Sequence, residues 1–128
     1  MIFWNNATKL TVFCLLPLAL GGCDRAEQMS FSQDVKPILD QNCIACHVPG
    51  EPGQNASGFS MESYDDLMKG TNFGPMIIAG NSETSNMVVL MEGRADPSIS
   101  MPHGELEPVS KADIAKIRLW IDQGAKNN

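Results

Sequence analysis

The chain has 128 residues, of which 15 are acidic and 9 are basic, and its formal net charge is −6. This length suits one small domain with a short additional segment, and it is short for two domains that each have a core. The acidic balance argues against a nucleic-acid partner and favours a basic protein partner, because net charge steers association between macromolecules.

The N-terminal segment has the pattern of an export signal. Lys9 precedes an apolar run from Leu10 to Leu20, which is shorter than the about 20 apolar residues of a transmembrane helix and is typical of a signal peptide. The sequence Leu20-Gly21-Gly22-Cys23 resembles a bacterial lipobox. That resemblance implies cleavage before Cys23 and lipidation of this cysteine, so we predict a lipoprotein signal peptide over residues 1–22.

Lipidation of Cys23 would leave the protein in the periplasm, attached to a membrane. Several acyl chains give stable attachment, and Asp24 resembles an inner-membrane retention signal. Residues 23–30 are then expected to form a lipidated tether, and residues 31–128 the folded domain. Loss of residues 1–22 removes Lys9 and leaves 8 basic against 15 acidic residues, a formal charge of −7.

The expected domain shows helical spacing wherever a period occurs, and no convincing strand pattern. We therefore predict an all-α fold of about four short helices. Asp34 is the expected cap of the first helix, with Pro37 in its first turn, where the missing N–H does little harm. Ser63 begins the second helix with a capping-box-like pattern, and Gly70 ends it.

The third and fourth helices are predicted further along the chain. An apolar stretch from Asn86 to Met91 is followed by Gly93. The last helix extends from Ser110 to Gly124 and is the best defined. It begins with a capping-box-like pattern and places isoleucines on one face, next to Trp120.

Gly- and Pro-rich loops separate these helices, over Pro49–Gly58, Thr71–Gly80 and Asp96–Pro108. So much loop around short helices leaves few apolar side chains for the core of so small a domain. A large apolar cofactor at the centre would supply the missing buried area.

Residues 43–47 form a Cys-x-x-Cys-His motif, the pattern of c-type haem attachment. Side chains three or four residues apart on a helical turn face the same way. Cys43 and Cys46 can therefore reach the two vinyl groups of one porphyrin and form thioethers, while His47 projects toward the iron. We predict one covalently bound haem c.

Two other interpretations of the motif remain open, although the haem is favoured. Cys43, Cys46, His47 and His103 supply four potential zinc ligands, but adjacent Cys46 and His47 are awkward for a tetrahedral site. A redox disulfide of the thioredoxin type would need a βαβ setting, which the sequence does not show.

Beyond the motif, the chain resembles the small monohaem class I cytochromes c, most closely their planctomycete-type domain. The resemblance is carried by FSQDVKPILDQNCIACH at 31–47, SYDDLMKG at 63–70, AGNSETS at 79–85, MP at 101–102 and LWIDQGA at 119–125. It implies the class I cytochrome c fold, which is all-α, with the first and last helices crossing beside one covalently bound haem.

The resemblance also implies a sixth iron ligand, because the family places a methionine before a proline in the loop that precedes the last helix. Met101-Pro102 stands at that point. Met76 is a rival, whereas Met87 and Met91 lie four residues apart in an apolar segment and are expected to be core. His103 stands where many relatives have a second proline, and imidazole also binds haem iron. We expect His103 to be a partly exposed residue near the haem edge.

Together these features predict a periplasmic, membrane-anchored electron-transfer protein with one haem c, attached to Cys43 and Cys46 and ligated by His47 and Met101. The sequence shows no nucleophile–base arrangement and no glycine-rich phosphate loop, so we expect no enzyme activity. Expected partners are redox proteins, through a basic docking surface on the partner or within a dehydrogenase complex. The alternative function is a haem-based ligand sensor or binding module whose sixth ligand is labile or absent.

Overall fold

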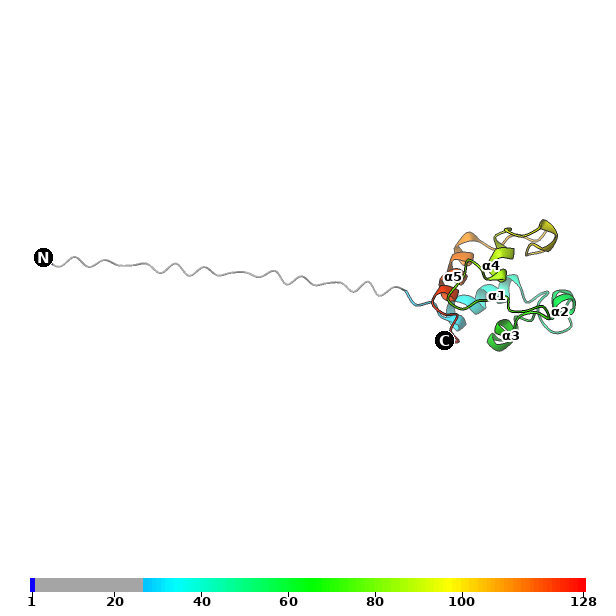
Figure 1. Cartoon of the computed structure of the whole chain (residues 1–128), viewed down its shortest axis with the longest axis horizontal. Coiled ribbons are helices and arrows are strands. Elements are labelled where there is room, and N and C mark those ends of the chain that lie inside the picture. The colour runs from blue at the N-terminus through cyan, green and yellow to red at the C-terminus, as the bar shows by residue number, and fades with distance from the viewer. Residues whose placement is uncertain (2–26) are drawn as a thin grey trace.

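The computed structural model describes Met1 and residues 27–128. The remainder of the expected signal peptide and the Cys23 lipidation site lie outside the described residues. The elements in chain order are the π-helical turn η1 (Phe31–Val35), α1 (Lys36–Asn42), α2 (Pro52–Ser57), α3 (Tyr64–Lys69), α4 (Asn86–Met91), the 3-10 turn η2 (Pro97–Ile99) and α5 (Lys111–Asp122) (Figure 1).

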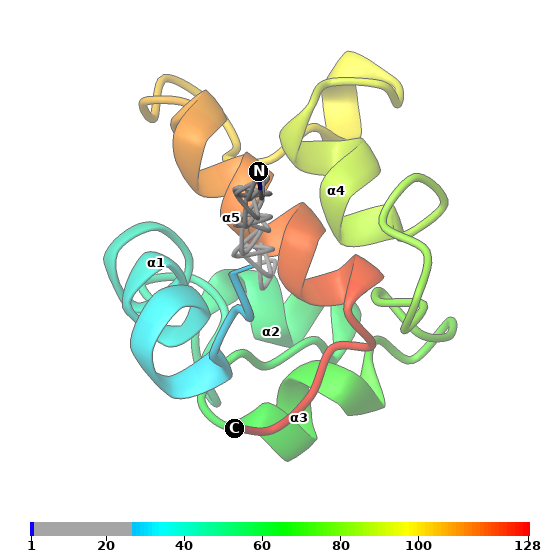
Figure 2. The same ribbon diagram turned by 90° about the vertical axis from the view of Figure 1, so that its left-hand side faces the viewer.

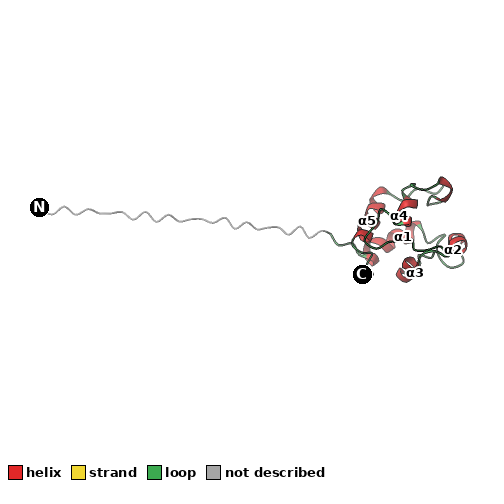
Figure 3. Cartoon of the chain, in the orientation of Figure 1, coloured by secondary structure: helices red, strands yellow, loops and turns green. Residues whose placement is uncertain are grey.

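Loops join these helices, and the described part of the chain contains no strand (Figure 3). Its one β-type pairing is an isolated bridge between Thr71 and Gly74. The all-α fold predicted from the sequence is confirmed. No helix within residues 27–128 has the length and apolar character that crossing a membrane requires.

The first helical segment begins earlier than predicted. The N-cap is Ser30 and not Asp34: the Ser30 Oγ accepts the Gln33 N–H at 3.3 Å, and the Asp34 carboxylate accepts the Ser30 N–H at 2.8 Å. Asp34 is therefore the return partner of a reciprocal cap. The turn η1 then leads into α1, where Pro37 lies in the first turn as predicted.

Helix α2 is an addition to the predicted set, because it lies in a segment that the sequence suggested to be loop. Pro52 occupies the first turn, and Gly58 ends the helix with a φ of 76°. A φ of this sign is accessible to glycine without steric cost. The helix has only six residues and no buried side chain, so it leaves no apolar period in the sequence.

The three other predicted helices are present, close to their predicted bounds. The Ser63 side chain accepts the Asp66 N–H at the start of α3, and the Ser110 side chain accepts the Asp113 N–H at the start of α5, each at 3.1 Å. Both serines also donate to the aspartate three residues later. The capping-box-like starts predicted from the sequence are therefore confirmed, with Ser63 and Ser110 as the N-caps.

The two ends of the domain meet in an aromatic cluster of Phe31, Tyr64 and Trp120. The Phe31 ring lies 5.2 Å from that of Tyr64 and 5.6 Å from that of Trp120, measured between ring centroids. The Tyr64 hydroxyl donates to the Ala125 carbonyl at 2.8 Å, and the C-terminal segment correspondingly lies beside α3 (Figure 2). The expected contact between the first and last helical segments is present.

Folded structure extends upstream of Phe31, into the end of the expected tether. The Met29 side chain is buried, and its N–H donates to the Gln123 side chain at 2.8 Å. The Gln123 amide in turn donates to the Glu27 carbonyl. These bonds hold the start of the domain against the end of α5.

Candidate functional site

The Cys-x-x-Cys-His segment forms the turns that directly follow α1. The Cys43 N–H donates to the Leu39 carbonyl at 2.8 Å, and the N–H groups of Cys46 and His47 donate to the Cys43 carbonyl at 3.1 and 3.0 Å. These bonds continue a helical path, so the two thiols and the imidazole line the same cavity. Both cysteines are half-buried and have free thiols.

The cavity has a volume of about 910 Å³, within the roughly 300–1,000 Å³ of pockets that hold small molecules and cofactors. Its walls come from α1, α2, α4, η2 and the loops that join these elements to one another and to α5. Most of the lining is apolar, and it includes no aspartate, glutamate, lysine or arginine side chain. Such a lining suits a large apolar ligand.

One hydrogen bond fixes the orientation of the His47 ring. The side chain is buried, and its Nδ1 donates to the Phe59 carbonyl at 3.1 Å. With the proton on Nδ1, the other ring nitrogen, Nε2, carries a free lone pair. A hydrogen bond of this kind orients histidine ligands and raises their basicity toward a metal.

Because Gly53 has no side chain, the His47 ring can lie directly beside its α-carbon. A Cβ atom at position 53 would lie 2.8 Å from the Cys46 carbonyl oxygen and 3.0 Å from His47 Nε2, closer than carbon atoms normally approach. The Gln54 N–H donates to the same Cys46 carbonyl at 3.0 Å. Helix α2 therefore packs its backbone directly on the motif, and only glycine fits at the contact.

The residues present fit a covalently attached haem. Two free thiols, an imidazole with Nε2 available and a largely apolar cavity are the groups that haem c needs. Gly53 and the Phe59 carbonyl complete this arrangement, and the sequence reasoning missed both. Neither belongs to a local motif: Phe59 contributes only its backbone, and Gly53 lay in a segment interpreted as loop.

All four methionines considered as ligands line the cavity, namely Met76, Met87, Met91 and Met101. Met87 belongs to the buried core, as predicted, and Met76 and Met91 are half-buried and pack against it. Met101 is half-buried and lies outside this core, with its N–H donating to the Leu90 carbonyl at 3.2 Å. The cavity thus brings Met101 and His47 to one site, and ligation by Met101 stays a prediction.

His103 is exposed and also lines the cavity. Within residues 27–128, no three side chains of histidine, cysteine, aspartate or glutamate gather as a metal-binding cluster. The zinc interpretation needed Cys43, Cys46, His47 and His103 to converge, so the described geometry disfavours it.

Burial changes the acidity of the first thiol. Removal from water raises the pKa of Cys43 to about 11, and the nearby Cys46 adds a smaller effect in the same direction. The Cys43 thiol is therefore protonated near neutral pH. The redox-disulfide interpretation gains no support from this thiol, since thiolates are the reactive form in such exchange.

The fold and the cavity define a small all-α domain with a haem-type site, and sequence comparison agrees. Residues 43–105, which begin at Cys43 and include Met101, match the family described as Planctomycete cytochrome C. The resemblance predicted from the sequence is confirmed over these residues, which are similar to the planctomycete-type cytochromes c. This family implies haem c.

A curated relative is the hydrazine synthase subunit alpha of Kuenenia stuttgartiensis, which is 22% identical over 128 aligned residues. The match covers 80% of this chain but only 16% of the relative. The chain thus corresponds to a small part of that enzyme subunit. No solved structure gives a significant match.

Proposed function

We propose that the protein is a one-haem electron-transfer protein. The haem supplies the redox chemistry, cycling the iron between its ferrous and ferric states. Cys43 and Cys46 would attach it through thioethers, and His47 Nε2 and Met101 Sδ would bind its iron. A thioether ligand raises the reduction potential relative to a second histidine and closes the iron to other ligands.

The observation that carries this proposal is the convergence of these four residues on one apolar cavity. Cys43, Cys46 and His47 follow α1, whereas Met101 comes from the loop between η2 and α5. No charged side chain lines the cavity, and exclusion of water and charge is what stabilises a neutral thioether as a ligand in place of water.

The Phe59 carbonyl and Gly53 would orient the His47 ring. The hydrogen bond from His47 Nδ1 to Phe59 holds the proton away from the iron-binding nitrogen. The bare α-carbon of Gly53 leaves the ring in place. Both act before any electron is transferred, by setting the orientation of the ligand.

We further propose that the protein is attached to a membrane in the periplasm through lipidated Cys23. The lipobox-like sequence before Cys23 supports this placement. Redox proteins of a membrane or of an attached enzyme would then be its partners. That the curated relative is a subunit of an enzyme is in keeping with a role beside a redox enzyme.

Absorption spectra of the oxidised and reduced holoprotein test this proposal. Ferric haem with a methionine ligand has a weak long-wavelength band, and we expect Met101→Ala to abolish it, to lower the reduction potential and to open the iron to carbon monoxide. Met76→Ala is the matched control, because Met76 lines the same cavity, and it should keep the band.

Three results would contradict the proposal in different ways. A band that survives Met101→Ala and is lost in Met76→Ala would move the ligand to Met76. Haem without the band in the unaltered protein, together with ready binding of carbon monoxide, would favour the ligand sensor. Absence of haem would remove both functions.

A further inference from the structure

Exposed apolar side chains gather at the opening of the cavity. Among the described residues beyond Met1, five large apolar side chains are markedly exposed, and four of them also line the cavity: Phe73, Ile78, Ile99 and Leu106. We call these four residues the mouth cluster. Phe73 is 89% exposed, and the others are between 46% and 59% exposed. Such a concentration on one small domain is characteristic of an interaction site.

A hydrogen-bonded turn of the backbone holds Phe73 in its exposed position. The Thr71 N–H and hydroxyl both donate to the Gly74 carbonyl, at 2.9 and 3.1 Å, and the Phe73 N–H donates to the Thr71 hydroxyl at 3.0 Å. This turn also leaves no room for a side chain at position 70, where a Cβ would lie 2.5 Å from the Gly74 carbonyl oxygen. A closed turn therefore presents the ring to solvent.

The mouth cluster lies in an acidic setting. Glu105 and Glu107 flank Leu106, and Glu51 precedes the cavity-lining Pro52; all three carboxylates are exposed and form no ion pair within the described residues. Of the nearby cations, Arg94 is paired with Glu83 and Glu92. Lys69, in the last turn of α3, is exposed. The cluster is thus apolar at its centre and mainly acidic at its border.

We propose that the mouth cluster docks a redox protein whose contact surface has an apolar patch bordered by lysine or arginine. This inference rests on the proposed function. Complementary charge would steer the partner, and the apolar contact would bring it to the cavity opening. A second copy of this chain would meet its own acidic border, and an anionic membrane surface would meet the same repulsion.

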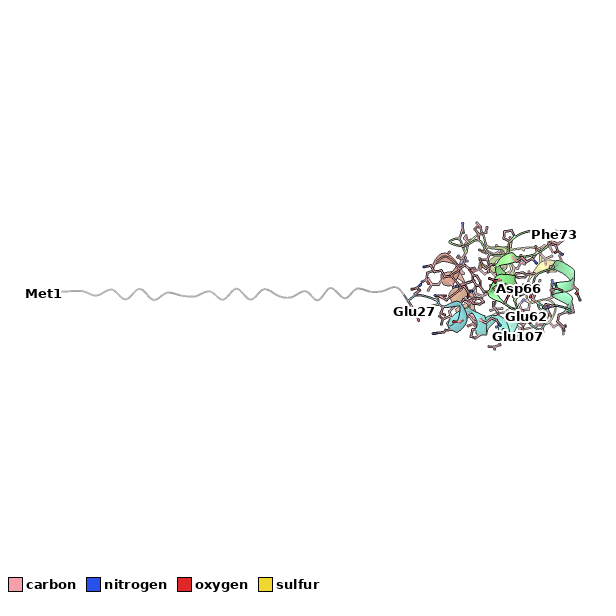
Figure 4. The ribbon with its side chains drawn as sticks, turned by 90° about the horizontal axis from the view of Figure 1, so that it is seen from below. Met1, Glu27, Glu62, Asp66, Phe73 and Glu107 are labelled. Atoms are coloured by element: carbon pink, nitrogen blue, oxygen red, sulfur yellow. The ribbon has the colours of Figure 1, made fainter. Side chains whose placement is uncertain are left out.

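The position of the cluster leaves it accessible to a protein partner. Phe73 lies at the end of the domain opposite Glu27, the first residue of the described domain (Figure 4). A protein attached through residues before Glu27 would therefore present Phe73 away from the point of attachment.

Oxidation of the reduced holoprotein by two inorganic probes tests the proposal. Tris(phenanthroline)cobalt(III) is cationic and apolar, like the proposed partner surface, whereas hexacyanoferrate(III) is anionic. Each takes one electron from the protein, giving cobalt(II) or hexacyanoferrate(II) and the ferric protein. We expect the cobalt rate constant to fall with rising ionic strength and the hexacyanoferrate rate constant to rise.

Phe73→Ser should lower the cobalt rate constant severalfold. Leu119→Ser is the matched control, because Leu119 is 41% exposed on α5 and does not line the cavity, and it should have no effect. Equal rate constants in the two variants, or the same salt dependence for both probes, would overturn the docking surface. Failure of both probes to oxidise the unaltered protein would instead contradict the proposed function.

Sedimentation of the holoprotein provides a readout that needs no electron transfer. We expect a monomer for the unaltered protein and for Phe73→Ser. A dimer that dissociates in Phe73→Ser would identify a second copy as the occupant and overturn the proposed partner.

Discussion

At the scale of single residues, the imidazole of His47 is fixed from two sides. The Phe59 carbonyl accepts the proton of Nδ1, and Gly53 supplies a flat backbone contact beside Nε2. Orientation by a backbone carbonyl is robust to mutation of the side chain that carries it, whereas the contact at Gly53 depends on the residue type. The placement of the His47 ring is therefore most sensitive to a change at Gly53.

Gly53→Ala should destabilise the holoprotein and disturb the iron site. The added methyl group must displace either His47 or the Cys46 carbonyl, and overpacking of this kind costs about 1–3 kcal/mol. We expect a lower free energy of unfolding in urea and a changed absorption spectrum.

Gln54→Ala is the control for that experiment. Gln54 belongs to the same helix but contributes its backbone N–H to the site, so its truncation should change stability by no more than about 0.5 kcal/mol. If the two variants had the same stability and the same spectrum, the proposed role of Gly53 would be wrong.

At the scale of elements, α5 is the longest helix in the described chain and contacts both η1 and α4. Its start depends on Ser110, whose hydroxyl accepts the Asp113 N–H. Ser110→Ala should lower the free energy of unfolding by about 1 kcal/mol, because an unpaired N–H remains at the helix start. Lys116→Ala, at an exposed position of α5, should have a much smaller effect; equal losses would contradict the cap.

An ion-pair network links α5 to both sides of α4. Arg118 pairs with Glu83 at 2.7 Å and with Glu92 at 2.9 Å, and Arg94 pairs with the same two carboxylates. The hydrogen bond from Arg118, and then the charge of Arg94, hold the pKa of Glu83 below its ordinary value of 4.5. The network therefore needs Glu83 to be ionised.

The lowered pKa of Glu83 determines the direction in which its contribution to stability changes with pH. A carboxyl group of lowered pKa stabilises the folded state above its ordinary value of 4.5 and loses that contribution as the pH falls through its folded value. Glu83→Gln should therefore reduce the loss of stability in acid. Glu62→Gln, an exposed position without an ion pair in the described chain, should reduce it less, and urea unfolding at several pH values checks the difference.

The elements show where sequence reasoning succeeds. Ser63 and Ser110 predict the starts of α3 and α5 because a cap is a local pattern of a few residues. The Cys-x-x-Cys-His motif is equally local, and it predicts the cofactor site. The sequence does not predict helix α2 because none of its side chains is buried, so its apolar residues show no helical period. The cap at Ser30 is equally local, because Ser30 accepts the Gln33 N–H and Asp34 accepts the Ser30 N–H. Asp34, shortly before Pro37, offers a competing cap pattern four residues later, which is why the predicted start was wrong.

Long-range contacts limited the prediction of the site in the same way. The bond from His47 to Phe59 and the approach of Gly53 to the ring depend on how α2 folds back onto the motif. No spacing in the sequence encodes that approach. The resemblance predicts Met101 as a ligand, whereas its place in the cavity lining follows only from the fold.

At the scale of the whole molecule, the two ends of the domain differ in structure and in the role that we propose for them. One end joins the start of the domain to its final residues: Asn128 accepts the N–H groups of Phe31 and Ser32, each at 2.9 Å. The other end presents Phe73 at the cavity opening (Figure 4). The residues that line the cavity therefore come from the middle of the domain, while its first and last residues bond to each other.

A core of this size gains much from a cofactor that fills the cavity. Small domains bury a small share of their surface, and a group that binds only the folded state stabilises it. Covalent attachment would keep such a group in place. We therefore expect Cys43 and Cys46 to carry one haem.

The mass of the intact protein under denaturing conditions is the direct test, after production with haem-attachment machinery. We expect the chain to gain the mass of one haem, and the double variant Cys43→Ser/Cys46→Ser to keep the mass of the bare chain. A chain of unaltered mass, or a haem that separates on denaturation, would contradict this expectation.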